Sequence, residues 1–505
     1  MPSEQPYLLG IDLGTSAVKV GVYSATGERI ALESDEYALT PQADAVEADP
    51  ELYWAPVARA VRRVLRRIGG SPDRIVAAST STFGESVFPM LKDGTPARPS
   101  ISWMDGRSSA EADLLVSQLG AQHLLEISGQ PEINAVWPAT KFLWMKRHEP
   151  EVFARVATFL LPDDYLLYRL TGQLVAELSM WGSSLLLDIR SKTWAEASLE
   201  AVGLRPAQLP TRTQTGTVLG TISPACAAET GLSTRTLVVA GAMDQMCAAV
   251  GAGNIEPGIV TESTGTVVAL LTTLEAPIFD SVTRVPCHIH AVPGKYCLLP
   301  WSPTGGMVLK WFKDRFGETE IARAAQEGRD VYDLLCEHAA AIPPGSDGLI
   351  LLPFLEGAGF PEFHPAARGV LLGLSLKHTK AHLTRAILES IAYLVRADLE
   401  ALQRLGVSPR EVCLLGGAAK SVLWSQIKAD VLGLPVAVLP GSDTAALGAA
   451  MIAAVGAGLL PDLPSAVAAM GRPASVLLPQ AETRAVYDHA YSRYRQLFEH
   501  VKVLF

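Results

Sequence analysis

Several short segments combine carboxylates, hydroxyls and glycines at spacings that could bind and move a phosphoryl group. The first, GIDLGTSAVK, places Asp12 after an apolar run and follows it with a turn of small residues. An aspartate there can bind Mg²⁺ directly or through its waters. Gly14, Thr15 and Ser16 can offer donors to an anion, and Lys19 can add a positive charge. The alternative is an ordinary hairpin turn capped by Asp12.

A second carboxylate, Asp244 in the segment GAMDQM, follows another apolar run and precedes small residues. At the mouth of a cleft it could accept the proton of a substrate hydroxyl as that oxygen attacks phosphorus. Proton transfer to a positioned base contributes about 10²–10⁴ in rate. Aspartate also caps helices well, and from this segment alone a helix N-cap is the favoured interpretation.

Two glycine turns could hold a nucleotide. Ser263–Thr266 reads STGT and resembles the first turn, so it could grip phosphate from the other half of the chain. In Leu414–Ser421, LLGGAAKS, an apolar run leads into two glycines, where a flat ring or a phosphate can approach the backbone closely. Neither turn is specific by itself.

Alternating helix and strand patterns surround these segments and predict an α/β fold. Apolar runs at 7–11 and 18–23 predict a β-hairpin, and 260–272 partly repeats it, which suggests a duplicated architecture. Further strands are predicted at 75–78, 237–240 and 412–415, and helices at 52–68, 111–125, 141–148, 380–405 and beyond Ser421. GAGNIEPG near Asn254 predicts the boundary between domains 1–254 and 255–505.

Composition narrows the class of protein. The 505 residues are 49% hydrophobic and 19% charged, which predicts two or more domains. The net charge of −10 argues against nucleic acid or an anionic membrane as partner. Scattered cysteines and an N-terminus without a signal pattern predict a cytoplasmic location. The uncharged stretch Thr444–Pro461 is rich in Ala and Gly, so we expect a buried helix rather than a membrane span.

Missing motifs exclude other classes. The sequence has no GxxxxGK[ST], HRD or DFG, so it is neither a P-loop enzyme nor a protein kinase, and GAGNIEPG lacks the GxGxxG spacing of a dinucleotide site. Cys287, His288 and His290 are zinc-ligand types, but further ligands are not evident.

Taken in this order, the segments resemble the FGGY carbohydrate kinases of the actin-like ATPase superfamily, above all the xylulokinase-like members. The resemblance runs from Tyr7 to about Gly458 and includes ISWMDGR, WPATKFLWMKRH, LLPDDYLLYRLTG and LPFLEG. It implies two actin-like (ribonuclease H-like) α/β domains with a central nucleotide and sugar cleft. It also implies transfer of phosphate from ATP to a hydroxyl of a small sugar or polyol, and leaves a homodimer open.

A ketose such as xylulose is the expected acceptor. Glycerol, erythritol or a tetrulose, and gluconate remain alternatives within the family. From other classes, an actin-like ATPase switch and a catalytically silent sugar sensor remain.

The resemblance also implies roles for individual residues. The residue matching Asp244 is the catalytic base in such kinases, and the one matching Asp12 helps to hold Mg²⁺. The nucleotide would lie among Gly265, Thr266, Gly306, Lys310, Gly417 and Ser421, the last two near the adenosine. The sugar would contact Phe83, Gly84, Glu85, Trp103, Asp105 and Asp244.

The sequence departs from the family pattern at three places. Ser81–Glu85 reads STFGE where xylulokinases usually carry Gln-Met-His, and Glu85 matches a hydroxyl-binding Glu of glycerol kinases without the Arg before it. Val136 stands where an aromatic, Met, Gly or Ser opens the family signature. Residues 442–444, Ser-Asp-Thr, replace an acidic-glycine pair before the Ala-rich helix and predict an altered adenosine pocket.

Overall fold

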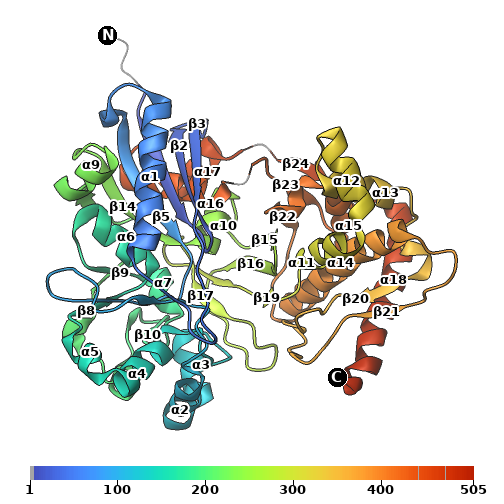
Figure 1. Cartoon of the computed structure of the whole chain (residues 1–505), viewed down its shortest axis with the longest axis horizontal. Coiled ribbons are helices and arrows are strands. Elements are labelled where there is room, and N and C mark those ends of the chain that lie inside the picture. Colours follow the sequence, from blue (N-terminus) through green and yellow to red (C-terminus); the bar gives the residue numbers. More distant parts are fainter. Residues whose placement is uncertain (1–4, 442, 473) are drawn as a thin grey trace. The chain divides into compact units, whose positions relative to one another are not determined.

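The computed structural model describes residues 5–441, 443–472 and 474–505 (Figure 1). The chain divides into two compact units. The first comprises Met1–Ile255, Thr273–Leu298 and Asp443–Arg472, and the second comprises Glu256–Thr272, Leu299–Ser442 and Pro473–Phe505. Two segments that follow residue 254 in the chain therefore pack with the first unit.

A six-stranded sheet forms the centre of the first unit, in the order β13-β14-β5-β1-β2-β3. β1 (Tyr7–Leu13) and β2 (Ala17–Ser24) are antiparallel, which confirms the predicted hairpin, and β3 (Arg29–Glu36) extends it. β5 (Ile75–Thr82) is parallel to both β1 and β14 (Leu237–Met243), and β13 (Val218–Thr221) closes the other edge. The carboxyl ends of β1, β5 and β14 therefore meet at one edge of the sheet.

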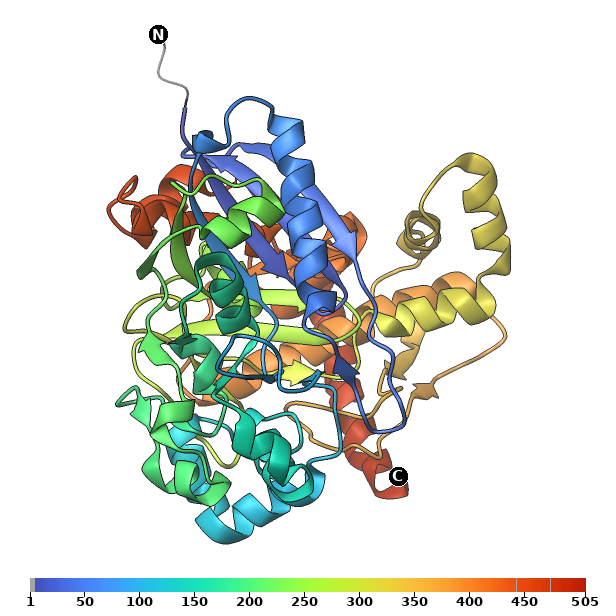
Figure 2. The same ribbon diagram turned by 60° about the vertical axis from the view of Figure 1, so that its left-hand side comes forward.

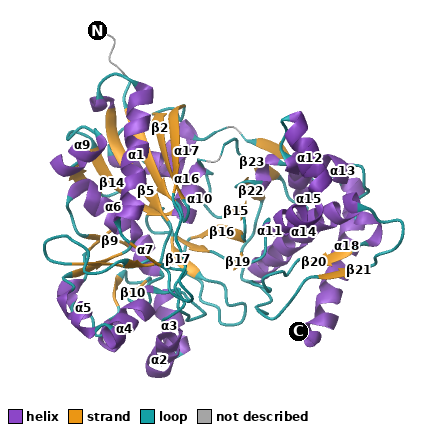
Figure 3. Ribbon diagram, in the orientation of Figure 1, coloured by secondary structure: helices purple, strands orange, loops and turns teal. Residues whose placement is uncertain are grey.

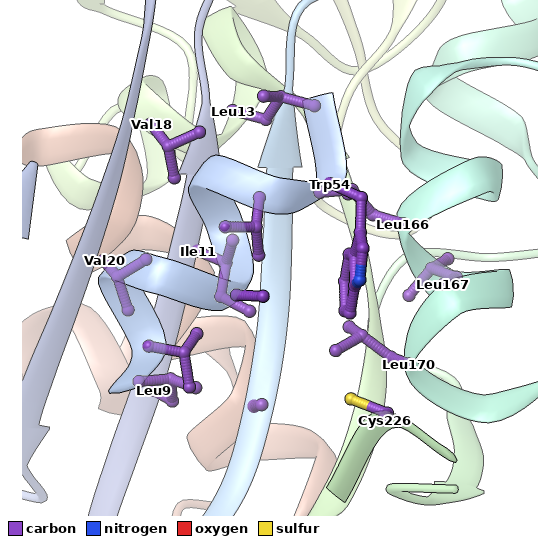
Figure 4. Close-up of a cluster of buried hydrophobic side chains, with 14 of the residues drawn as sticks. Leu9, Ile11, Leu13, Val18, Val20, Trp54, Leu166, Leu167, Leu170 and Cys226 are labelled. Carbon is purple, nitrogen blue, oxygen red and sulfur yellow. The ribbon is translucent and has the colours of Figure 1, made fainter. Parts of the chain in front are cut away.

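Successive side chains of β1 point to opposite faces of the sheet, and nearly all of them are buried. Leu9, Ile11 and Leu13 join the hydrophobic core with Trp54 of α1 (Glu51–Ile68) and Leu166 of α6 (Pro162–Thr171) (Figure 4). The long helix α1 runs along this sheet (Figure 2). Because strand side chains alternate between faces, Gly10 and Asp12 lie on the opposite face from this cluster.

Helices α10 (Asp244–Gly251) and α16 (Thr444–Gly456) pack backbone against backbone on that opposite face. A Cβ on Gly448 would lie 1.9 Å from the carbonyl oxygen of Cys247, and one on Gly10 would lie 1.9 Å from that of Ala446. This close approach explains the Ala and Gly composition of α16 and confirms the predicted buried helix. No helix among the described residues is long and apolar enough to cross a membrane.

The second unit repeats the strand pairing of the first, and Figure 3 distinguishes its strands from its helices by colour. β15 (Ile259–Thr264) and β16 (Val268–Leu274) form an antiparallel hairpin, and β22 (Glu411–Leu415) runs parallel to β15. β23 (Val436–Val438) and β24 (Ser475–Leu477) continue the sheet. The long helices of this unit are α14 (Lys380–Arg404), α15 (Val422–Leu432) and α18 (Ala481–Val501). A hairpin followed by a parallel strand thus occurs twice.

One predicted helix is wrong in its extent. The segment 111–125 forms two helices, α2 (Ser109–Leu119) and α3 (Ala121–Ser128), because Gly120 between them adopts a φ of 82°. α4 (Pro138–His148) begins three residues before the predicted Lys141, with proline in its first turn.

The remaining helices and strands complete the two units. The helices are α5 (Pro150–Arg155), α7 (Leu178–Gly182), α8 (Glu196–Val202), α9 (Pro224–Thr230), α11 (Met307–Phe316), α12 (Glu318–Glu327), α13 (Val331–Ala340) and α17 (Leu463–Met470). The strands are β4 (Glu47–Ala48), β6 (Phe88–Met90), β7 (Ser100–Ile101), β8 (Thr158–Leu160), β9 (Val175–Glu177), β10 (Leu187–Asp188), β11 (Thr193–Trp194), β12 (Thr211–Thr213), β17 (Cys287–Ile289), β18 (Tyr296–Leu298), β19 (Trp301–Ser302), β20 (Ile350–Leu352) and β21 (Val370–Leu372).

Candidate active site

Asp12 lies near the carboxyl end of β1 and is half-buried. Ser81 Oγ on β5 donates a 2.8 Å hydrogen bond to Asp12 Oδ1, whereas the turn itself is closed by the amide of Gly14 and the carbonyl of Ala17, 3.0 Å apart. Burial raises the pKa of Asp12, and Ser81 and the Lys19 ammonium oppose that rise. The Asp12 carboxylate is thus bound to the neighbouring strand.

The predicted anion turn follows Asp12. Gly14 and Thr15 are half-buried and Ser16 is exposed. Lys19 stands opposite Asp12 in the register of the hairpin. The turn therefore presents polar groups at the same edge of the sheet as Asp12.

Asp244 is the first residue of α10, directly after β14, and is half-buried. Burial raises its pKa to about 7, the negative charges of Asp12 and Glu85 contribute to the rise, and the amide of Gln245, 2.6 Å from Oδ1, opposes it. A base is most effective when its pKa is near the operating pH. Asp244 is the first helical residue of α10 and Met243 is the N-cap, so Asp244 is not the helix cap that the alternative interpretation expected, and its environment suits a base.

Glu85 lies just beyond β5 in a conformation that is uncommon for its residue type. Its φ is 61°, in the left-handed region that glycine favours, and such strain is often found at functional sites. Ser183 Oγ donates a 2.8 Å hydrogen bond to Glu85 Oε1. Burial raises the pKa of Glu85, opposed by Ser183 and by the Lys141 ammonium.

The two residues before Glu85 are buried in the first unit. The Phe83 ring belongs to the hydrophobic core and lies 5.6 Å from the ring of Tyr53. A Cβ on Gly84 would lie 3.1 Å from the sulfur of Met243. Any contact of Phe83 with a sugar would thus come from its backbone.

Asp105 and Trp103 lie on the loop after β7. Asp105 is 2% exposed and accepts hydrogen bonds from the amide of Val46 at 2.8 Å and from Arg107 Nη2 at 2.7 Å. Trp103 is half-buried, and its amide donates to Ser86 Oγ at 2.9 Å. The protein itself therefore already occupies much of the binding capacity of Asp105.

Sequence reasoning missed Lys141, which is 1% exposed. Its Nζ donates to the carbonyl oxygens of Ala135 and Val136, each at 2.5 Å. Burial lowers its pKa to about 7, opposed by the charges of Glu85 and Asp105. The only sequence signal for a buried lysine here was its position directly before the apolar residues Phe142 and Leu143 in a predicted helix. Val136, one of the departures from the family pattern, thus contributes its backbone carbonyl to the contact with Lys141.

The second unit contains the predicted phosphate turn between β15 and β16. The amide of Gly306 donates to the carbonyl of Gly265 at 2.8 Å, and that of Met307 to the carbonyl of Thr266 at 3.3 Å. A Cβ on Gly306 would lie 2.5 Å from Gly265 O, so only glycine fits there. Gly265 and Thr266 are exposed, and Lys310 Nζ lies 2.6 Å from Asp314 Oδ2 in an exposed ion pair.

A buried ion pair lies next to the strand that enters this turn, and sequence reasoning did not identify it either. Lys428 Nζ lies 2.7 Å from Glu262 Oε2 and 2.9 Å from Thr264 Oγ1, and the charged side chains are at most 1% exposed. Thr264 in turn donates to Glu262. Thr264 directly precedes Gly265, so the network fixes the strand that enters the turn.

A pocket of about 350 Å³ in the second unit lies at the predicted adenosine segment. Its lining comprises Gly416, Ala419, Lys420, Val422, Ser425, Val438, Leu439, Pro440, Gly441, Ser475 and Leu477. Of the predicted residues, Gly417 follows the lining residue Gly416, and Ser421 caps α15 by accepting from the amide of Trp424 at 3.2 Å.

The predicted change to this pocket at 442–444 is not supported at Asp443. Asp443 is fully buried in the first unit, where it accepts hydrogen bonds from Tyr23 at 2.8 Å and from Arg472 at 2.7 Å. Thr444 begins α16, and Ser442 lies outside the described residues.

Two other features do not involve the predicted site residues. A pocket of about 570 Å³ lies in the first unit, and its lining includes Arg98, Tyr165 and Arg169 but none of the predicted site residues. His290 Nδ1 accepts from the amide of Val292 at 3.0 Å. Within residues 5–441, 443–472 and 474–505, no group of three or more His, Cys, Asp or Glu side chains could hold a metal ion.

Known proteins share this sequence and fold. Residues 7–251 match the N-terminal domain of the FGGY family of carbohydrate kinases, and residues 261–457 match the C-terminal domain of that family. The chain belongs to the FGGY family of carbohydrate kinases. The predicted family and the two-domain α/β fold are thus confirmed, and the chain is a carbohydrate kinase with ATP as the phosphate donor that its family implies.

Individual relatives carry different substrate names. Over 499 residues the chain is 30% identical to the xylulose kinase of Bacillus subtilis (strain 168), covering 99% of this chain and 98% of the relative. It is 29% identical to the gluconokinase of the same organism, covering 88% and 86%. The crystal structure of xylulose kinase from Rhodospirillum rubrum superposes with a TM-score of 0.89 at 28% identity, covering 99% of both chains.

Proposed function

We propose that this kinase transfers the γ-phosphoryl group of ATP to a hydroxyl of a small, uncharged ketose or polyol, with xylulose as the first candidate. Asp244 carries this proposal, because its pKa near 7 lets it accept a proton at neutral pH. The acceptor oxygen forms a bond to phosphorus, the bond between that phosphorus and the ADP oxygen breaks, and the hydroxyl proton passes to Asp244.

The charge around Asp244 favours an uncharged acceptor over a sugar acid. Asp12 and Glu85 already raise the pKa of Asp244 by their negative charge. Of the cations in this unit, Arg107 binds Asp105, Lys141 binds two carbonyls, and Lys19 stands opposite Asp12 in the hairpin. The carboxylate of an aldonate would add a negative charge to this group and would be repelled. We therefore place gluconate behind ketoses and polyols.

Asp12 is the residue we propose for Mg²⁺. Its half-buried carboxylate has the oxygen chemistry that Mg²⁺ binds, and a single carboxylate suffices because the ion keeps several waters and takes phosphate oxygens. When bound, the ion would neutralise charge on the phosphates. Asp12 would hold the ion, and Ser81 would fix the orientation of the carboxylate.

For the nucleotide we propose two parts of the second unit. The exposed turn at Gly265 and Thr266, together with the start of α11 at Gly306, would bind phosphate oxygens, since a helix N-terminus attracts anions. The pocket of about 350 Å³ beside Gly416 would accept the adenosine. A homodimer and a cytoplasmic location stay predictions.

The test is a screen for ADP release with purified protein and Mg²⁺-ATP across pentuloses, hexuloses, tetruloses, polyols and aldonates, with mass spectrometry of the products. We expect a phosphorylated ketose or polyol and a kcat/KM for gluconate at least about 10-fold lower. A preference for gluconate would refute the argument from charge. ADP release without a phosphorylated product would point instead to an ATPase switch, and no turnover with any sugar would point to a sensor.

A further inference from the structure

The short helix α7 (Leu178–Gly182) and the residue that follows it contact the amide of Met243, directly before Asp244, and the carboxylate of Glu85. Residues 178–184 are all buried. Ser179 lies in the first turn of α7, Ser183 directly follows its last residue, and both are 0% exposed. Residues four apart lie on the same side of a helix, so one element can contact two groups through these serines.

At the first end, Ser179 holds the backbone that precedes the base. The amide of Met243 donates to Ser179 Oγ at 3.1 Å, and Met243 is the last residue of β14, directly before Asp244. On this side of β14 the pairing with β13 reaches only Val239. The Ser179 hydroxyl therefore takes the place of a strand as partner for the last amide of β14.

Glu177 fixes the orientation of that hydroxyl. Ser179 Oγ donates to Glu177 Oε2 at 2.5 Å, and the same carboxylate accepts the amides of Ser179 at 2.8 Å and Met180 at 3.2 Å. Thr215 Oγ1 donates to Glu177 Oε1 at 2.7 Å. With its proton directed to Glu177, Ser179 presents a lone pair to Met243.

At the second end, Ser183 holds Glu85. Its hydroxyl donates to Glu85 Oε1 at 2.8 Å, closer than the alternative acceptor, the carbonyl of Met180, at 3.3 Å. Glu85 has a φ of 61°, so its backbone conformation depends on the surrounding contacts. A hydrogen bond to a charged group is stronger than one between neutral groups.

We infer that α7 is a positioning element for the kinase reaction, in which Ser179 places the base Asp244 and Ser183 places the sugar-binding carboxylate Glu85. This inference rests on the proposed function. Because the two serines act on groups with different roles, their loss has different kinetic signatures. Ser179 affects proton transfer and hence kcat, and Ser183 affects sugar binding and hence KM.

The test compares three matched variants, Ser179→Ala, Ser183→Ala and Ser184→Ala. Ser184 is the control: it is also 0% exposed, but its hydroxyl donates to the carbonyl of Trp181 at 2.6 Å and accepts from the amide of Leu186 at 3.1 Å. Steady-state kinetics are measured with the sugar that the wild-type enzyme phosphorylates. Calorimetric titration with ATP gives the competent fraction to which kcat is normalised.

We expect Ser179→Ala to lower normalised kcat about 10-fold, a fraction of what a positioned base contributes, with KM for the sugar changed less than about twofold. Ser183→Ala should raise that KM about 10-fold, as expected for a lost hydrogen bond to a carboxylate, with kcat within about threefold. Ser184→Ala should leave both within about twofold.

If all three variants show the same change, or only a loss of competent fraction, α7 is merely structural and the inference fails. A wild-type enzyme that phosphorylates no sugar or polyol would instead refute the proposed function, before any variant is compared.

Discussion

Replacing the base Asp244 by Asn should separate its chemical role from its role at the start of α10. Asparagine keeps the shape and can still accept the amide of Gln245, which lies 2.6 Å from Oδ1, but it cannot take a proton from a hydroxyl. We expect kcat to fall about 10²–10⁴-fold. The same change removes the negative charge of Asp244, which the carboxylates of Asp12 and Glu85 repel.

The effect on stability follows from the pKa of Asp244, which burial chiefly raises from 3.8 to about 7. A group whose folded pKa is raised loses stabilising free energy as pH rises from the unfolded to the folded pKa. A rise of that size corresponds to at most about 4 kcal/mol, and because Asp244 is only half-buried we expect about 2 kcal/mol. Asp244→Asn should therefore be more stable than the wild type at pH 8, with little difference near pH 4.

Thermal unfolding at pH 4, 6 and 8 measures this difference. At pH 8 we expect the melting temperature of the variant to exceed that of the wild type by about 2–3 °C. A variant that keeps near-normal turnover would refute the assignment of the base. A variant that is equally destabilised at every pH would show that the carboxylate of Asp244 serves mainly to start the helix.

The remaining predictions concern pH, the phosphate turn and the close helix contact. In the wild type, kcat/KM should fall as pH decreases through about 7, because Asp244 becomes protonated, and a flat pH profile would contradict this. Lys428→Met leaves Glu262 buried without its partner, so guanidinium unfolding should show a loss of about 3–5 kcal/mol, while the exposed Lys377→Met should change little. Gly448→Ala would place a Cβ 1.9 Å from Cys247 O, and we expect about 3 kcal/mol of destabilisation or insoluble protein; full stability would refute the close contact.

Local patterns predicted the elements of this fold well where the signal was strong. The hairpin at β1 and β2, the long helix α14 and the buried helix α16 follow from apolar runs, helical spacing and Ala-Gly composition. The break at Gly120 was missed because a glycine within a helical pattern can also be accommodated, and only the φ of 82° shows that the helix ends there.

Some residues of the candidate site could be predicted from the sequence and others could not. Asp12 and Asp244 could be selected because each carboxylate follows an apolar run, a pattern that places both at the edge where parallel strands end. Lys141 and the pair of Lys428 and Glu262 could not be assigned, since their partners are distant in sequence or are backbone carbonyls. Helix α7 has five residues, too few for a helical period to be recognised.

Asp443 shows why a departure from a family pattern does not by itself indicate a change in the nearest site. It begins the segment Asp443–Arg472, which packs with the first unit, and its carboxylate forms two 2.7 Å contacts with Arg472, the last residue of that segment. This bidentate ion pair therefore joins the first and last residues of the segment Asp443–Arg472. Tyr23 of β2 adds a hydrogen bond at 2.8 Å, and Arg29 of β3 adds another at 3.1 Å. The acidic residue at this position therefore serves the packing of α16 on the sheet that carries Asp12.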